Sequence, residues 1–179
     1  KKGPTVGSGG GEDAQPFTVN FPFGIAMAHN GNVANYEALR GNLEHDALRV
    51  LYSGCDVEVI LNVFASALSR AKGATFAPQV FWAMAEVFKR VKGSYSAAAI
   101  VGGHGLVAFR DPYGIKPAIL GRRKEGKGTG WCVASESAVT TTASVRSQAP
   151  SERVSTALSL WPAISTPLAP IASVAAFMS

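Results

Sequence analysis

Residues 93–110 read Gly-Ser-Tyr-Ser-Ala-Ala-Ala-Ile-Val-Gly-Gly-His-Gly-Leu-Val-Ala-Phe-Arg and separate a helical part of the sequence from a strand-rich part. Two short apolar runs, 95–101 and 106–110, flank a segment with three glycines at 102–105. This arrangement is typical of a β-hairpin. The pattern of apolar residues therefore changes from a helical period to a strand period at Gly93.

Helices are predicted before this hairpin and further strands after it. In chain order, the predicted elements are strands at 17–20 and 25–29, helices from about residue 35, over 57–68 and over 77–91, and strands at 95–101, 106–110, 118–122 and 131–135. The second helix is expected to be amphipathic, and the aromatic side chains of the third, Phe81 and Trp82, are expected in the core. Strands, then helices, then a strand meander predict an α+β fold.

The composition indicates a globular domain of modest charge. Lys and Arg number 17 against 12 Asp and Glu, which gives a net charge of +5, and 47% of the 179 residues are hydrophobic. Much of the positive charge lies in one glycine-containing loop at 122–127, and no basic run is interleaved with aromatic residues. We therefore expect no nucleic-acid partner.

The last 40 residues differ from the rest of the sequence. All 19 glycines lie before residue 131, whereas 25 of the 40 residues from 140 to 179 are Ser, Thr, Ala or Pro. We divide the chain into a domain at 1–139 and a divergent tail at 140–179 with no assigned domain. Pro162, Pro167 and Pro170 interrupt the uncharged end of this tail, so no membrane span is predicted.

The cysteines and histidines show no spacing typical of a metal site. Cys55 and Cys132 belong to no Cys-x-x-Cys pair, and the three histidines lack ligand spacing. Reduced thiols fit a cytoplasmic location, or a plastid if the source is a plant or alga. His29 is expected to be a packing residue.

Two short motifs each leave two interpretations open. Asn30-Gly31-Asn32 fits a tight turn. At a strand-to-helix junction, however, the Gly31 N–H and the Asn30 side chain would be two donors of an oxyanion hole. Asp56 is either the N-cap of the second helix, which the residues alone favour, or a carboxylate that binds a ligand.

Six motifs occur together in one order and at characteristic spacing. They are Pro4-Thr5-Val6-Gly7-Ser8, Ala14-Gln15-Pro16-Phe17, Ala28-His29-Asn30-Gly31-Asn32, Asp56-Val57-Glu58-Val59, residues 105–117, and Ala134-Ser135-Glu136-Ser137. Over about residues 3–137, this series resembles the glutaminase domain of the amidophosphoribosyltransferase family. These enzymes are class II glutamine amidotransferases of the N-terminal nucleophile superfamily.

The resemblance implies a four-layer αββα sandwich that hydrolyses the side-chain amide of glutamine. In the family, the ammonia passes to a second, phosphoribosyltransferase domain, which makes 5-phosphoribosylamine from phosphoribosylpyrophosphate in the first committed step of purine synthesis. By motif position, Asn30 and the Gly31 N–H would form the oxyanion hole and Asp56 would bind the α-amino group. Lys2 stands where the family has an arginine that binds the glutamine carboxylate.

The family's nucleophile is a cysteine at the mature N-terminus, and this sequence begins with Lys1. The resemblance gives Cys55 and Cys132 no such role, and no phosphoribosylpyrophosphate-binding signature is present. We therefore expect a fold that is incomplete at both ends and a chain that is inactive by itself. The alternatives are a non-catalytic module that binds glutamine or a partner chain, and part of a related amidotransferase such as glucosamine 6-phosphate synthase.

The resemblance also implies partners and cofactors. No cofactor is implied within this segment. Magnesium is implied in the transferase domain, and an iron–sulfur cluster in some relatives. The expected partners are glutamine, the transferase domain and, at full length, further copies of the chain. A membrane is not among them.

Overall fold

The computed structural model describes residues 14–125, 128–135, 146–147 and 157–159, and they form an α+β fold as predicted. The elements in chain order are β1 (Phe17–Val19), β2 (Ile25–Val33), α1 (Tyr36–His45), α2 (Asp56–Leu68), α3 (Phe76–Arg90), β3 (Gly93–Val101), β4 (Gly105–Arg110), β5 (Ile119–Glu125), β6 (Gly128–Ala134), β7 (Arg146–Ser147) and β8 (Ala157–Ser159). The hairpin predicted at 93–110 is formed by β3 and β4, which pair antiparallel.

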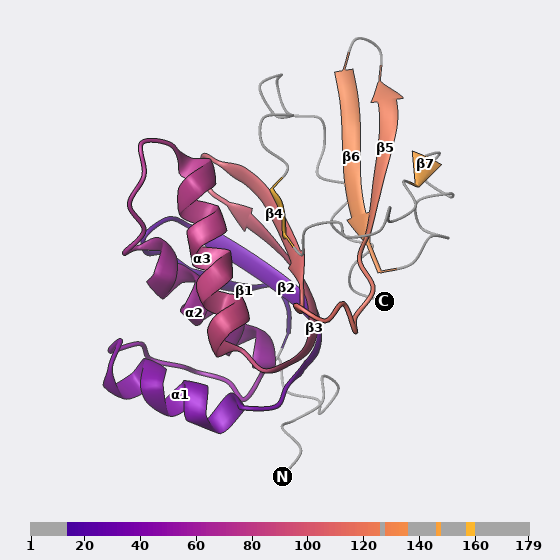
Figure 1. Ribbon diagram of the computed structural model, residues 1–179. Coiled ribbons are helices and arrows are strands. Elements are labelled where there is room, and N and C mark those ends of the chain that lie inside the picture. Colours follow the sequence, from indigo (N-terminus) through magenta and orange to yellow (C-terminus); the bar gives the residue numbers. More distant parts are fainter. Residues whose placement is uncertain (1–13, 126–127, 136–145, 148–156, 160–179) are drawn as a thin grey trace.

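The strands form two antiparallel sheets. The larger has the order β1-β2-β3-β4-β8, and the smaller has the order β6-β5-β7. Figure 1 shows α2 and α3 against one face of the larger sheet, with the β5–β6 ribbon standing beyond β3 and β4, away from the helices. The short strands β7 and β8 come from the segment 140–179, and the domain division at residue 139 stays a prediction.

Helix α2 is the centre of the core. It packs against α1, α3, β1 and β2, and all 13 of its residues are buried. The sequence predicted a helix with one apolar face, but these neighbours surround it. Its polar residues Glu58, Asn62 and Ser66 are therefore buried as well.

Two aromatic residues of α3 were wrongly expected in the core. Phe81 and Trp82 are 45% and 42% exposed. The buried face of α3 holds Val80, Ala83, Met84 and Val87, which recur at three- and four-residue spacing. At about 100° per residue, Phe81 and Trp82 lie away from that face. No helix among the described residues is long and apolar enough to cross a membrane.

Strand β2 is longer than predicted and contains the Asn30-Gly31-Asn32 motif. Asn30, Gly31 and Asn32 pair with Ser96, Tyr95 and Ser94 of β3. The motif is therefore neither a turn nor the strand-to-helix junction itself, because β2 continues to Val33 and α1 begins at Tyr36. The pairing with β3 explains why the strand extends beyond the predicted residue 29.

Glycine is required at position 31 by the close approach of β3. A Cβ there would lie 2.6 Å from the Cα of Tyr95 and would collide with the Ser94 carbonyl oxygen. Both neighbours are backbone atoms of a paired strand, which cannot move without breaking the sheet. The absence of a side chain at Gly31 is thus a packing requirement.

We predict that Gly31→Ala lowers the free energy of unfolding by at least about 2 kcal/mol, because it overpacks a rigid backbone contact. Gly41→Ala is the matched control, since a Cβ at Gly41 would meet nothing within 4 Å. In helix α1 that change should raise the free energy of unfolding by about 0.5–1 kcal/mol. Urea denaturation of both variants checks this, and equal stabilities would contradict the close approach.

Candidate functional site

The site forms at the edge of β2 that β1 leaves uncovered. Strand β1 pairs only with the first residues of β2, and its first residue, Phe17, lies opposite Met27. Beyond this pair the backbone N–H groups on that edge have no strand partner in β1. Buried backbone N–H groups need a hydrogen-bond acceptor, so groups other than β1 must accept from them.

Side chains accept the hydrogen bonds of two of these donors. The His29 N–H donates to Gln15 Oε1 at 2.6 Å, and the Val33 N–H donates to Asp56 Oδ2 at 2.7 Å. N–H groups two residues apart in an antiparallel strand point to the same side. The Gly31 N–H therefore lies on this edge between the two, where an incoming acceptor would meet it.

Asp56 supplies a buried carboxylate oxygen next to this donor. Its side chain is 6% exposed, Oδ2 is occupied by Val33, and Oδ1 has no hydrogen-bond partner in the described part of the chain. Burial raises the pKa of the Asp56 carboxyl, and the hydrogen bond from Val33 partly offsets this. A buried oxygen of this kind is costly to leave unpaired, and a donor or a cation that reached it would offset the cost.

The N-cap role predicted for Asp56 is wrong. Cys55 occupies the N-cap position in an extended conformation, and Asp56 is the first residue of the helix. The Asp56 side chain is directed to β2, where it accepts from the Val33 N–H. The N-cap interpretation, which the residues alone favour, is therefore excluded, and the ligand-binding interpretation stays a prediction.

The structure describes some of the other residues named in the sequence analysis, but not all of them. Asn30 is exposed and precedes Gly31 in β2, and Asp56 bonds to Val33, two residues after Gly31, so the three residues lie toward the same end of this strand. Lys2 lies outside the described residues. Cys55 is buried at the start of α2, and Cys132 is buried in β6 of the smaller sheet.

The loop after β4 is organised by Asp111, close to the start of β3. The Asp111 carboxylate accepts hydrogen bonds from the backbone N–H groups of Tyr95, Tyr113, Ile115 and Lys116, at 3.0 to 3.3 Å. Burial alone would raise the pKa of Asp111, but these four donors outweigh it and hold the pKa below its ordinary value. Asp111 therefore has a structural role, because it holds the backbone of this loop.

His29 is buried beside the candidate site, as predicted. Neither ring nitrogen has a hydrogen-bond partner among the described residues. Burial, with a smaller contribution from Lys116, lowers the pKa of His29 from 6.5 to about 4. The ring is therefore neutral at physiological pH and packs as an apolar group.

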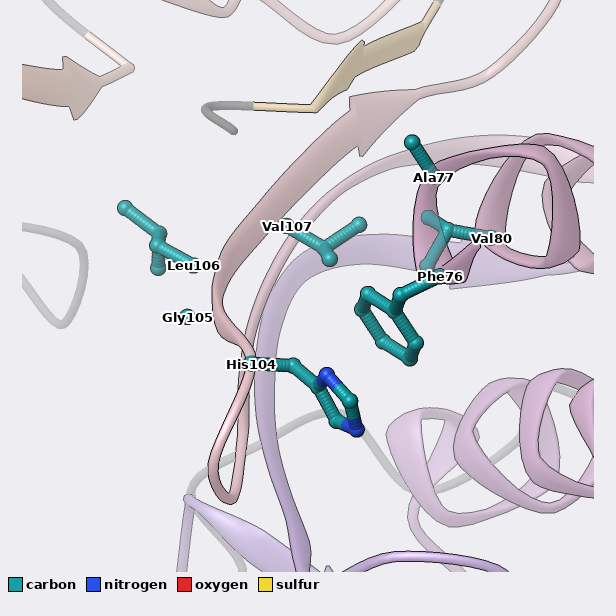
Figure 2. A pocket seen from close by; sticks show the side chains of 7 residues that line it. All are labelled: Phe76, Ala77, Val80, His104, Gly105, Leu106 and Val107. Carbon is teal, nitrogen blue, oxygen red and sulfur yellow. The ribbon is translucent and has the colours of Figure 1, made fainter. Parts of the chain in front are cut away.

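A small pocket lies at the opposite end of the sheet. Figure 2 shows that it is lined by the start of α3 and by the β3–β4 hairpin, where the ring of His104 faces that of Phe76. The two rings stack with centroids 3.8 Å apart. Val101, the last residue of β3 before the hairpin turn, pairs with Ile25 at the start of β2, far along the strand from Gly31. No group of three or more His, Cys, Asp or Glu residues in the described ranges could hold a metal ion.

The sequence interpretation missed Gln15 and Glu58. Gln15 was quoted only as part of a family motif, yet its amide oxygen accepts from the uncovered edge of β2. Glu58 is the third helical residue after the N-cap of α2, the position of the acidic residue in a capping box. The Ser or Thr that normally marks that motif is replaced here by Cys55, which hid the signal.

Comparison with known proteins identifies the class to which the chain belongs. Residues 8–141 match the family described as "Glutamine amidotransferase domain". The chain is therefore a member of the glutamine amidotransferase domain family.

Curated relatives narrow the resemblance to one kind of enzyme. The chain is 43% identical to amidophosphoribosyltransferase of Escherichia coli (strain K12) over 136 residues, which are 75% of this chain and 27% of that protein. It is 42% identical to the Schizosaccharomyces pombe enzyme over 139 residues, 77% of this chain and 26% of that protein. A chloroplastic enzyme of Arabidopsis thaliana is 35% identical over 123 residues, 68% and 20% of the two chains. The predicted resemblance to amidophosphoribosyltransferases is confirmed, and the chain spans about a quarter of the length of these relatives.

Solved structures confirm the fold type. The glutamine phosphoribosylpyrophosphate amidotransferase from B. subtilis aligns with a TM-score of 0.59 at 24% identity, over 78% of this chain and 28% of that one. A structure described as the allosteric regulatory enzyme of purine biosynthesis aligns with a TM-score of 0.62 at 24% identity, over 80% and 28%. The fold is thus of the N-terminal nucleophile hydrolase type expected from the sequence.

We predict that His29 makes the protein less stable in acid. The folded state has the lower pKa, so the stabilisation from neutral His29 is complete above pH 6.5 and is lost as the pH falls toward about 4. The loss amounts to at most about 3 kcal/mol. Urea denaturation from pH 7 to pH 4 should show a flatter pH dependence for His29→Gln than for the native sequence. NMR titration of the native histidine gives an independent check, and a pKa near 6.5 would contradict the prediction.

Proposed function

We propose that this chain is the glutamine-binding part of an amidophosphoribosyltransferase, with the chemistry of a class II glutaminase. The observation that carries the proposal is the buried Oδ1 of Asp56, which has no hydrogen-bond partner among the described residues and lies beside the edge of β2 that β1 leaves uncovered. Membership of the glutamine amidotransferase domain family supports it. So do relatives named amidophosphoribosyltransferase in bacteria and fungi.

The proposal gives each residue a physical task. The α-ammonium of glutamine donates to Asp56 Oδ1 and compensates the buried charge. The Gly31 N–H and the Asn30 side-chain amide donate to the amide oxygen, which gains negative charge when a nucleophile attacks the carbonyl carbon. The Gly31 N–H is already in place before the reaction, because β2 is held in the sheet on its other side by β3.

Attack on the amide requires a thiolate, as the resemblance implies. The carbon–sulfur bond forms, the carbon–nitrogen bond breaks, and the nitrogen takes up the proton that the thiol gave up, so that ammonia leaves. Water then hydrolyses the thioester to glutamate and restores the thiol. Cys55 and Cys132 are not proposed for this task, because both are buried. The family draws its nucleophile from a mature N-terminal cysteine instead.

The whole-protein activity is part of the same proposal. Ammonia would be used by a phosphoribosyltransferase domain, which makes 5-phosphoribosylamine from phosphoribosylpyrophosphate with magnesium bound there. Homo-oligomers at full length and a location in the cytoplasm, or in a plastid, complete the proposal. The names of the relatives support it, including that of the chloroplastic one.

We predict that Asp56→Asn weakens glutamine binding by at least about tenfold, the loss of one charge-assisted hydrogen bond. The asparagine carbonyl oxygen still accepts from Val33, but its NH₂ group then occupies the place of Oδ1 and faces the ammonium. Isothermal titration calorimetry of the purified chain measures this. Affinity should also fall as the pH drops through the raised pKa of Asp56, because the protonated carboxyl no longer attracts the ammonium. Equal affinity for both proteins would exclude Asp56 as the ligand.

We predict that the purified 179-residue chain releases no ammonia from glutamine, since neither of its cysteines is placed to attack. A coupled glutamate dehydrogenase assay measures the release. Turnover that Cys55→Ala or Cys132→Ala abolishes would contradict the prediction. Binding without turnover would agree with it and with a retained glutamine pocket.

A further inference from the structure

The chain between α1 and α2 ends in a tightly held segment at 51–55, which we call the strap. The strap leads directly into Asp56 at the start of α2. Leu51, Ser53 and Cys55 of the strap are buried. Its backbone groups therefore need partners within the protein, and three side chains from the two helices provide them.

Glu58 holds the strap from the side of α2. Its Oε1 accepts from the Tyr52 N–H at 2.9 Å, and its Oε2 accepts from the Ser53 N–H at 2.8 Å and from the Ser53 hydroxyl at 2.7 Å. Glu58 is itself 6% exposed. Three donors thus converge on one buried carboxylate, and both of its oxygens are used.

Two side chains of α1 hold the strap from the other side. The Ser53 carbonyl oxygen accepts from the Tyr36 hydroxyl at 3.1 Å and from Arg40 Nη1 at 3.3 Å. Arg40 does not neutralise Glu58 directly, because its ion pair is with Glu44, at 3.0 Å on the same helix. Ser53 is therefore held between α1 and α2.

A short series of hydrogen bonds connects Glu58 to the candidate site. The Ser53 hydroxyl that donates to Glu58 accepts from the Cys55 N–H at 3.1 Å. Cys55 precedes Asp56, and the Glu58 N–H donates back to the Cys55 carbonyl oxygen at 3.1 Å. Glu58 and Ser53 thus bind the backbone groups of the strap that lie on the N-terminal side of Asp56.

We propose that Glu58 is a positioning residue that sets the direction of the free Asp56 oxygen and so the selectivity of the site for ligands with an α-amino group. This inference rests on the proposed function, in which Asp56 binds the ammonium of glutamine. Asp56 has two constraints on its carboxylate, the hydrogen bond from Val33 and the path of its own backbone. Glu58 controls the second, and it reaches no ligand itself because its oxygens are all occupied by the strap.

The test compares the full chain with its Glu58→Gln variant, using glutamine and 4-carbamoylbutanoate, which lacks the α-amino group. The glutamine side chain that replaces Glu58 has the same length but only one acceptor oxygen, so one N–H group of the strap loses its hydrogen-bond partner. The dissociation constant for glutamine should rise about five- to tenfold, the effect of one lost hydrogen bond. That for 4-carbamoylbutanoate should change less than twofold. A general loss of structure would weaken both ligands alike.

Coupling to Asp56 is measured in a double-mutant cycle. In the Asp56→Asn background, Glu58→Gln should have no further effect on glutamine binding, because the oxygen that it positions is gone. Glu44→Gln is the control variant, since it removes an exposed carboxylate that pairs with Arg40 and, in the described part of the chain, makes no hydrogen bond with the strap. It should leave both dissociation constants unchanged.

Should Glu58→Gln fail to fold, Ser53→Ala replaces it, because it removes only the hydroxyl between Glu58 and Cys55. An equal loss of affinity for both ligands, or an additive effect with Asp56→Asn, would overturn the positioning role while leaving glutamine binding intact. No glutamine binding by the native chain would instead overturn the proposed function and this inference with it.

Discussion

The hydrogen bond from the Val33 N–H to Asp56 Oδ2 is the contact on which the site depends. It joins the end of β2 to the beginning of α2, two elements that are 23 residues apart in the chain. A carboxylate has two oxygens, and this bond occupies one of them at a distance of 2.7 Å. The other is buried and has no hydrogen-bond partner among the described residues, which costs free energy unless the carboxyl is protonated or a donor meets it. The same contact therefore joins the sheet to α2 and leaves one oxygen for the ligand that we propose.

The shortness of β1 is the second condition for a site. A longer first strand would pair with all of β2 and use every N–H on that edge. Because β1 is three residues long, Gln15 and Asp56 accept from His29 and Val33 instead, and the Gly31 N–H lies between them. Sheet edges are normally covered or blunted. Here the uncovered edge is rigid, since β3 holds β2 from the other side and allows no side chain at Gly31.

Most of the fold could be predicted, because periodicity reports which face of an element is buried. The three helices and the hairpin at 93–110 were found in this way. The errors have a common cause, since a local pattern does not contain the neighbours of an element. Phe81 and Trp82 look like core residues in the sequence but lie outside the buried face of α3. The extent of β2 was underestimated because Asn, Gly and Asn have low strand propensity, and pairing with β3 overrides that preference.

The sequence by itself determined the α+β class, the order of the elements and the motifs that place the chain among glutamine amidotransferases. These depend on residue spacing, which is local. The tertiary structure alone decided that Asp56 bonds to β2 rather than capping its helix, and that Glu58 holds the strap before it. A carboxylate with several donors nearby accepts from the one that burial leaves without water. Which donor that is depends on how the sheet, α1 and α2 come together, and no spacing along the chain encodes it.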